Sequence, residues 1–234
     1  MAIKLKPDGW KWEAVGPRQE LLRKLIQDKM ITFVSGPAGT GKTLVATYCG
    51  MDLLDKKLSA NGVDGMVISR PLISAGEGIG YLPGDVDDKI NPYMRAVQDI
   101  ILDSNHGMTQ TWLFSNEPLI ECIPVELMRG LTYTNKYCLI DEAQNLSIKQ
   151  MEMVMTRLGQ NSKMVICGDI NQIDLKGPSG FAHALELFKD DEDFGKVEFT
   201  LEDIQRAGIV RKVIIAYHEQ RKKNTPRESI KKTN

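Results

Sequence analysis

Five short segments of the chain consist almost entirely of apolar and β-branched residues. They cover residues 30–35, 66–69, 137–140, 163–167 and 196–201. Because these runs are nearly continuous in apolar residues instead of alternating with polar ones, they are typical of strands that helices cover on both faces. The pattern therefore predicts an α/β fold with a mostly parallel sheet.

Helical patterns lie between these segments. The expected helices cover residues 18–27, 41–58, 91–102, 147–158, 180–188 and 209–219. Ser147 suits an N-cap, and Gln150 completes a capping-box pattern three residues later. A stripe facing the core is predicted on the same helix from apolar residues at helical spacing. It consists of Met151, Val154, Met155 and Leu158.

One long segment, residues 71–135, interrupts this alternation. It includes Gly76, Gly78, Gly80, Pro83 and Gly84 within nine residues. A loop of that length inside a compact domain is usually functional or holds helices of its own. We therefore expect one α/β domain over residues 18–217, with 71–135 as a helical and loop insertion. Residues 1–17 would form an N-terminal extension, and residues 218–234 a basic C-terminal tail.

Composition excludes several classes of protein. The 234 residues are 42% hydrophobic and 26% charged, with a net charge of -1, which is typical of a globular protein and not of a disordered or collagen-like chain. No run approaches the roughly 18 apolar residues that a membrane helix needs. We expect a cytoplasmic protein with no membrane association. Its four cysteines are far apart in the sequence, so we expect reduced and mostly buried thiols.

The small net charge conceals an uneven distribution. Residues 218–234 hold six basic residues against two acidic ones, so this tail carries +4 and the rest of the chain about -5. A basic tail on an acidic body suits an electrostatic contact with phosphates. A solvated, frayed terminus explains the same residues.

The pattern GxxxxGK[ST] follows the first predicted strand and opens a helix. Its residues are Gly36, Pro37, Ala38, Gly39, Thr40, Gly41, Lys42 and Thr43. In such a phosphate loop the glycines let the backbone approach the phosphates, and the successive N–H groups supply positive potential. Lys42 is expected to reach the β- and γ-phosphates, and the Thr43 hydroxyl to hold Mg²⁺. The sequence therefore predicts nucleotide binding.

Two further motifs lie at the ends of predicted strands, where ligands of open α/β sheets bind. In LIDEAQ, Asp141 is expected to hold Mg²⁺, and Glu142 to orient or deprotonate the attacking water. The pair also suits the start of a helix, but its place after an apolar strand favours catalysis. In GDINQ, Gln172 is the candidate sensor of the γ-phosphate, although an ordinary strand-to-helix turn has the same composition.

In this order GPAGTGKT, LIDEAQ and GDINQ resemble the first motor domain of superfamily 1 helicases. Further segments resemble the PhoH-like family. They are Ser69-Arg70-Pro71, Ala75-Gly76-Glu77 to Leu82-Pro83-Gly84-Asp85, Asn91-Pro92-Tyr93, Met128-Arg129-Gly130, Thr156-Arg157-Leu158-Gly159 and Lys163-Met164. This resemblance covers about residues 19–217. It implies a RecA-like phosphate-loop ATPase fold that uses ATP with Mg²⁺, an RNA-linked role, and homo-oligomeric assembly into a ring such as a hexamer.

The resemblance also implies roles for residues outside the three motifs. Gln19 resembles the glutamine that reads the adenine edge in such motors. The segment Asp203–Arg206, followed by Arg211, resembles the family's C-terminal Asp-Val-Val-Arg segment, but Gln205 departs from it. Either Arg206 or Arg211 is therefore the candidate arginine finger, a group that stabilises charge on the transferred phosphoryl group. The finger acts within the chain or from a neighbouring subunit, unless both arginines belong to a solvated helix face.

These residues favour an ATP-hydrolysing, helicase-like motor or remodelling ATPase that acts on single-stranded RNA or DNA. The candidate contacts to nucleic acid are Arg70, Arg95, Arg129, Tyr81 and Tyr93, and aromatic rings of this kind stack on bases. The domain as a whole is not basic, and surface arginines and core tyrosines explain the same residues. Two alternatives are a phosphotransferase for a small molecule and a nucleotide-dependent switch or assembly ATPase that acts on protein partners.

Overall fold

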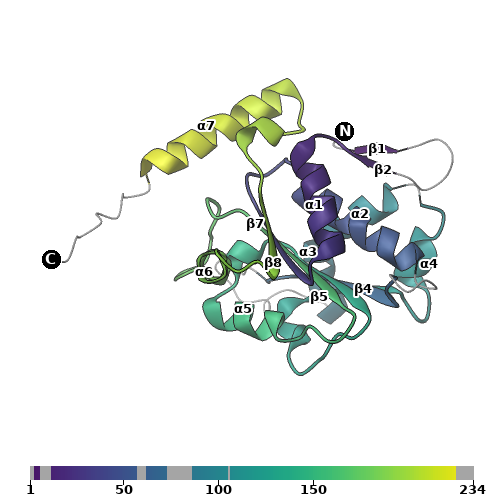
Figure 1. Cartoon of the computed structure of the whole chain (residues 1–234). Coiled ribbons are helices and arrows are strands. Elements are labelled where there is room, and N and C mark those ends of the chain that lie inside the picture. Colours follow the sequence, from purple (N-terminus) through teal and green to yellow (C-terminus); the bar gives the residue numbers. More distant parts are fainter. Residues whose placement is uncertain (1–2, 6–11, 57–61, 73–85, 105, 225–234) are drawn as a thin grey trace.

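A computed structural model describes residues 3–5, 12–56, 62–72, 86–104 and 106–224. Its centre is a six-stranded sheet in which every pair of neighbouring strands is parallel. The strand order is β5-β4-β6-β7-β3-β8. Figure 1 shows the sheet with the helices around it. The strands are β3 (Ile31–Ser35), β4 (Gly65–Arg70), β5 (Ile120–Pro124), β6 (Lys136–Ile140), β7 (Lys163–Gly168) and β8 (Phe194–Glu198). The predicted α/β fold with a parallel sheet is confirmed.

Helices cover both faces of the sheet. Four of them pack on one face: α1 (Pro17–Asp28), α2 (Lys42–Asp55), α3 (Val86–Leu102) and α4 (Thr109–Phe114). On the other face lie α5 (Ile148–Met155) and α6 (Gly180–Leu187). In β4, Met66 and Ile68 belong to the first core and Val67 to the second. Both sides of each central strand are thus buried, which explains why these strands are apolar at consecutive positions.

The N-terminus of α5 has the predicted cap. The Ser147 hydroxyl accepts a hydrogen bond from the Gln150 N–H at 3.3 Å, and the Gln150 side chain accepts one from the Ser147 N–H at 3.0 Å. Of the predicted stripe, Met151 and Val154 are buried in the second core and Met155 packs against them. The helix ends at Met155, before its predicted end at residue 158, so Leu158 packs against the same core from beyond the helix. Local sequence rules therefore predicted the start of this helix but not its end.

The long insertion contains more structure than its one predicted helix. Besides α3 and α4 it supplies β5, which pairs with β4 at the edge of the sheet. The sequence rules missed β5 because Glu121 and Pro124 interrupt its apolar pattern. The glycine-rich part of the insertion and Tyr81 lie outside the described residues.

Both ends of the described chain differ from the expected domain limits. Trp12, expected in an extension, lies in β2 (Trp12–Ala14), which pairs antiparallel with β1 (Ile3–Leu5). Its indole is buried and donates to Asp52 at 2.9 Å, which fastens the segment to α2. At the other end, α7 (Gly208–Asn224) continues past residue 217, because no glycine or proline occurs between Gly208 and Pro226.

Three of the four cysteines are buried, namely Cys49, Cys138 and Cys167. Burial raises the pKa of the Cys138 thiol to about 12, so this thiol stays protonated and unreactive at neutral pH. In the part of the chain that the structure describes, no helix combines the length and the apolar content required to cross a membrane.

A glycine in α2 is required by a close contact across the core. A Cβ at Gly50 would lie 2.6 Å from two ring carbons of Tyr137, whose hydroxyl donates to the Ala46 carbonyl at 2.6 Å. We expect Gly50→Val to lower the free energy of unfolding by about 1–3 kcal/mol, the usual cost of overpacking a core. Urea denaturation measures it. The control is Gly107→Val, where a Cβ meets nothing within 4 Å, and an equal loss in both variants would contradict this packing.

Candidate functional site

The phosphate loop joins the end of β3 to the start of α2. Its backbone adopts positive φ at Gly36 (137°), Gly39 (79°) and Gly41 (89°), which L side chains rarely adopt. At Gly36 an added Cβ would also lie 2.5 Å from the Phe199 carbonyl oxygen. The loop therefore keeps its shape only with these glycines. It delivers its N–H groups and the N-terminus of α2 to one point.

The Lys42 ammonium group lies inside the curve of this loop. Its Nζ donates to the carbonyls of Gly36 at 2.6 Å and Pro37 at 2.8 Å. Burial lowers the pKa of Lys42, and the carboxylates of Asp169, Asp141 and Glu142 act in the opposite direction. The loop thus holds a buried cation at the place where its pattern predicts phosphate.

Two carboxylates follow β6, on the neighbouring side of the site. The Thr43 hydroxyl donates to Asp141 Oδ1 at 2.8 Å. Glu142 has a φ of 55°, uncommon for a residue with a side chain, and this turn lets two consecutive carboxylates face the same cavity. Strand geometry alone would point them to opposite faces.

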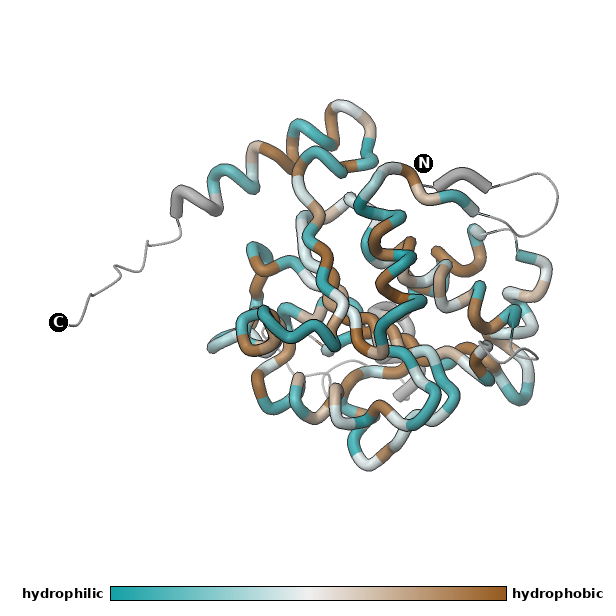
Figure 2. Tube along the Cα trace, in the orientation of Figure 1, coloured by the Kyte–Doolittle hydropathy of each residue, from teal (hydrophilic) through white to brown (hydrophobic). Residues whose placement is uncertain are grey.

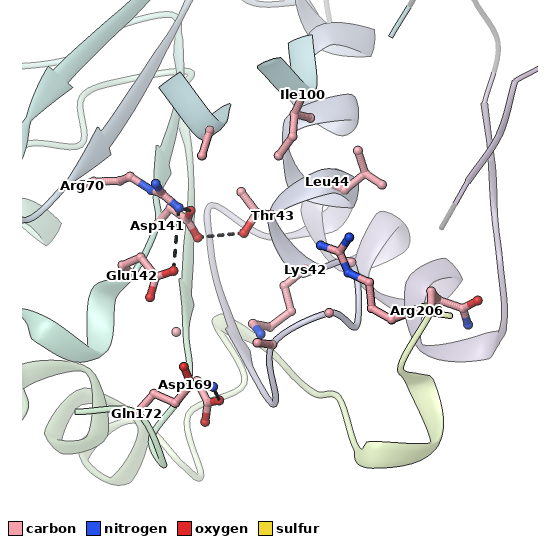
Figure 3. A pocket seen from close by; sticks show the side chains of 16 residues that line it. Lys42, Thr43, Leu44, Arg70, Ile100, Asp141, Glu142, Asp169, Gln172 and Arg206 are labelled. Atoms are coloured by element: carbon pink, nitrogen blue, oxygen red, sulfur yellow. Dashed lines mark hydrogen bonds and ion pairs between the residues drawn. The ribbon is translucent and has the colours of Figure 1, made fainter. Parts of the chain in front are cut away.

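Arg70, the last residue of β4, pairs with these carboxylates (Figure 3). Its Nε and Nη2 donate to Asp141 Oδ2 at 2.9 and 2.7 Å, and Nη2 lies 3.7 Å from Glu142 Oε1. Asp141 is 3% exposed, so a cation beside it offsets the cost of burying its charge. Sequence reasoning expected Arg70 at a nucleic-acid backbone, and that contact stays a prediction. In the structure its guanidinium pairs with the predicted metal ligand.

The loop after β7 closes the third side. Buried Asp169 accepts from the Gln172 side chain at 2.8 Å and from the Asn171 backbone at 2.9 Å. Gln172 lines the same cavity as Lys42. Four adjacent strands, β4, β6, β7 and β3, therefore end around one point, because parallel strands bring their carboxyl ends to one edge.

The chain before α7 forms the remaining wall. The Gln205 N–H donates to the Gly39 carbonyl at 2.9 Å, and an added Cβ at Gly39 would lie 3.0 Å from Arg206 Cγ. Arg206 thus packs across the phosphate loop of its own chain, as Figure 3 shows. Arg211 lies on the exposed part of α7 and does not line the cavity.

Gln19 also stands apart from the cavity. Its side chain is buried, accepts from the Val15 N–H at 2.8 Å and donates to the Thr40 carbonyl at 3.4 Å. The amide therefore links the backbone of the phosphate loop, at Thr40, to the backbone just before α1, at Val15. Its role in reading adenine stays a prediction.

Together these walls enclose a cavity of about 370 Å³. The predicted site residues that line it are Ala38, Gly39, Gly41, Lys42, Thr43, Asp141, Glu142, Gln172 and Arg206. Leu44, Ala96 and Ile100 add an apolar end. The Thr43 hydroxyl and Asp141 carboxylate are hard oxygen donors that fit Mg²⁺, which usually takes one or two protein ligands and completes its shell with phosphate and water.

Three polar residues of the site were not assigned their observed positions by the sequence. Arg70 and Asp169 line the cavity, and Gln144 lies between Glu142 and Asp169. Gln144 and Asp169 lie within LIDEAQ and GDINQ, directly after strands, so their position was a usable signal. Nothing in the pattern showed that Arg70 would pair with Asp141.

Residues 12–218 match the family described as PhoH-like protein. The chain is 40% identical over 193 residues to the PhoH-like protein of Bacillus subtilis. The aligned residues cover 81% of this chain and 59% of that protein. It is 38% identical over 197 residues to the protein PhoH of Escherichia coli K12. Here the aligned residues cover 83% of this chain and 54% of that protein. The chain thus spans less than two thirds of the length of either relative.

Among solved structures, the Pif1 of Bacteroides bound to ssDNA matches with a TM-score of 0.41 and 16% identity, over 89% of this chain and 47% of that one. The Pif1 helicase from Candida albicans matches with a TM-score of 0.38 and 15% identity. That match covers 80% of this chain and 40% of the helicase chain. Likeness at this level is too weak to support a statement about function.

The Arg70 pair yields a prediction about stability. We expect Arg70→Ala to lower the free energy of unfolding of the nucleotide-free protein by about 3–5 kcal/mol, because it leaves the buried Asp141 carboxylate without its cation. Arg18→Ala is the matched control: it breaks a two-bond ion pair with Asp203, but Arg18 is 37% exposed. That loss should stay at about 0–1 kcal/mol. Urea denaturation measures both losses. Equal losses of unfolding free energy in the two variants would contradict a stabilising role of Arg70 beside Asp141.

Proposed function

The chain belongs to the PhoH-like family of phosphate-loop NTPases, and from this membership and the site we propose that it binds ATP with Mg²⁺ and hydrolyses it. The observation that carries the proposal is the convergence of the phosphate loop, Asp141 and Glu142 on one cavity. A phosphate loop alone supports binding. A second carboxylate that faces the same cavity, Glu142, supports attack by water.

The phosphate loop and Lys42 are proposed to bind the phosphates. In the structure Lys42 Nζ is bonded to two carbonyls of the loop, and phosphate oxygens are stronger acceptors for an ammonium group. We expect Lys42 to turn from these carbonyls to the β- and γ-phosphates. Thr43 and Asp141 would hold Mg²⁺, which neutralises charge on the phosphates when bound.

Glu142 is the group placed to act on water. Its side chain is 48% exposed and faces the cavity, whereas Asp141 is buried against Thr43 and Arg70. The exposed carboxylate can therefore accept a proton or orient a water molecule while the buried one stays with the metal. Gln172, across the cavity, is the proposed contact to the γ-phosphate.

Two arginines are candidates for the proposed arginine finger. Arg206 lies in the cavity of its own chain and suits a contact in cis. Arg211 lies outside that cavity and suits a contact in a neighbouring subunit of a homo-oligomeric ring. Figure 2 shows hydrophobic positions along α7, in brown. Exposed apolar side chains on this helix support assembly, because stripes of this kind usually mark interfaces. They are Ile209, Val210, Val213 and Tyr217, with exposed fractions from 43% to 71%.

We further propose that turnover moves or remodels single-stranded RNA or DNA in the cytoplasm. Exposed Arg95 and Arg129 in the insertion support contact with a phosphate backbone. The competing function is a nucleotide-dependent switch that acts on protein partners. Two observations favour it: Arg70 is engaged with Asp141, and the apolar stripe of α7 suits a protein surface.

The proposed chemistry makes Glu142→Gln and Lys42→Ala separable. Glu142→Gln should lower phosphate release from ATP and Mg²⁺ by about 10²–10⁴-fold, because an amide cannot accept the proton, and should retain nucleotide binding. Lys42→Ala should lose both. Phosphate release and binding of a fluorescent ADP analogue measure the two properties. Near-wild-type turnover by Glu142→Gln in a clean preparation would refute its catalytic role.

The proposed motor function predicts that single-stranded nucleic acid stimulates ATP hydrolysis. We expect single-stranded RNA or DNA to accelerate steady-state phosphate release, with Glu142→Gln as the blank. The acceleration should weaken as salt rises, because contacts to phosphates release counterions. A rate that neither polymer changes would instead favour the switch that acts on protein partners.

A further inference from the structure

Gln144 is a buried amide between the ends of two strands. It lies in the short turn Ala143–Asn145, directly after Glu142 at the end of β6, and its exposed fraction is 2%. Across from it, at the end of β7, is the backbone of Asp169. The side chain is thus enclosed beside the proposed catalytic carboxylate without reaching the cavity itself.

The orientation of this amide follows from its partners. The Asp169 N–H donates to Gln144 Oε1 at 3.0 Å, and a backbone N–H can only donate. The oxygen must therefore face Asp169. The amide nitrogen is left facing Glu142, where Nε2 donates to Oε2 at 2.6 Å. If the amide were flipped, its NH₂ group would face the Asp169 N–H and its oxygen would face the Glu142 carboxylate. Neither pair could form a hydrogen bond.

These contacts restrain a carboxylate that would otherwise be mobile. Glu142 is about half exposed, and a glutamate side chain has several rotatable bonds. Gln144 Nε2 holds one carboxylate oxygen, while Arg70 Nη2 lies 3.7 Å from the other. We propose that Gln144 is a positioning residue that holds the Glu142 carboxylate towards the attacking water, a role that rests on the proposed ATP hydrolysis.

The same amide connects Glu142 to the segment of the γ-phosphate sensor. Asp169 binds Gln144 through its backbone and Gln172 through its carboxylate, at 2.8 Å. Hydrogen bonds therefore run without interruption from Glu142 through Gln144 and Asp169 to Gln172. The water-orienting group and the proposed sensor share one rigid frame.

Two substitutions separate positioning from folding. Gln144→Glu has nearly the same shape and keeps an acceptor for the Asp169 N–H, but presents a carboxylate oxygen to Glu142 in place of the donor. Gln144→Ala removes both contacts. Gln160→Ala, at an exposed amide, is the control. Circular dichroism and thermal melting of the full chain would check that each variant is folded.

We expect both Gln144 variants to lower kcat for ATP hydrolysis by about 10- to 100-fold, the usual cost of a misplaced or unsupported catalytic group. KM for ATP and the affinity for an ADP analogue should stay within about twofold, because Gln144 does not line the cavity. A kcat close to that of wild type in the folded Gln144→Glu protein would overturn the role. A rise in KM parallel to the loss of kcat would overturn it too.

A double-mutant cycle provides the decisive readout. If Gln144 acts through Glu142, Gln144→Ala should change the residual rate of the Glu142→Gln protein by less than about twofold. A further loss equal to that in the wild-type background would show a separate structural effect and overturn the proposal. A wild-type protein that releases no phosphate would overturn the proposed function and this role with it, whereas active wild type with unaffected Gln144 variants overturns this role alone.

Discussion

The site is organised by the burial of cations among carboxylates. Lys42 and Arg70 bring two positive charges to the edge of the sheet, and Asp141, Glu142 and Asp169 surround them. Burying Lys42, Asp141 or Asp169 without opposite charges or hydrogen-bond partners would be costly, so the buried groups depend on one another. The proposed nucleotide would enter this balance by exchange, because Lys42 would leave the carbonyls of the loop for phosphate oxygens.

This balance requires the parallel sheet. Arg70, Asp141, Asp169 and the phosphate loop follow β4, β6, β7 and β3, and these four strands are direct neighbours. Parallel pairing brings all four carboxyl ends to one edge, and the helices on both faces exclude water from the strands. The buried frame behind the carboxylates is then continuous. The Asp141 N–H completes a ladder bond to the Ser69 carbonyl, and Gln144 links the ends of β6 and β7.

Patterns of local origin were predictable. Continuous apolar runs identified β3, β4, β6 and β7, and the capping residues Ser147 and Gln150 marked the start of α5. Edge elements were not predicted as well. β5 is an edge strand whose central residues are only partly buried, and its apolar pattern is interrupted. β8 begins and ends earlier than its apolar run suggested. The segment around Trp12 joins the domain through long-range contacts, among them the buried indole and its hydrogen bond to Asp52, and no periodicity encodes such contacts.

The α/β class, the phosphate loop and the residue types of the site can be predicted from the amino-acid sequence. They depend on short-range patterns, such as a continuous apolar run or a glycine where the backbone needs a positive φ. Which side chains meet depends on the tertiary fold. Arg70 pairs with Asp141 across 71 positions of sequence, and Gln144 meets Asp169 across 25. The order β5-β4-β6-β7-β3-β8 makes these residues neighbours, and strand order follows from the packing of the whole chain, which local patterns do not contain.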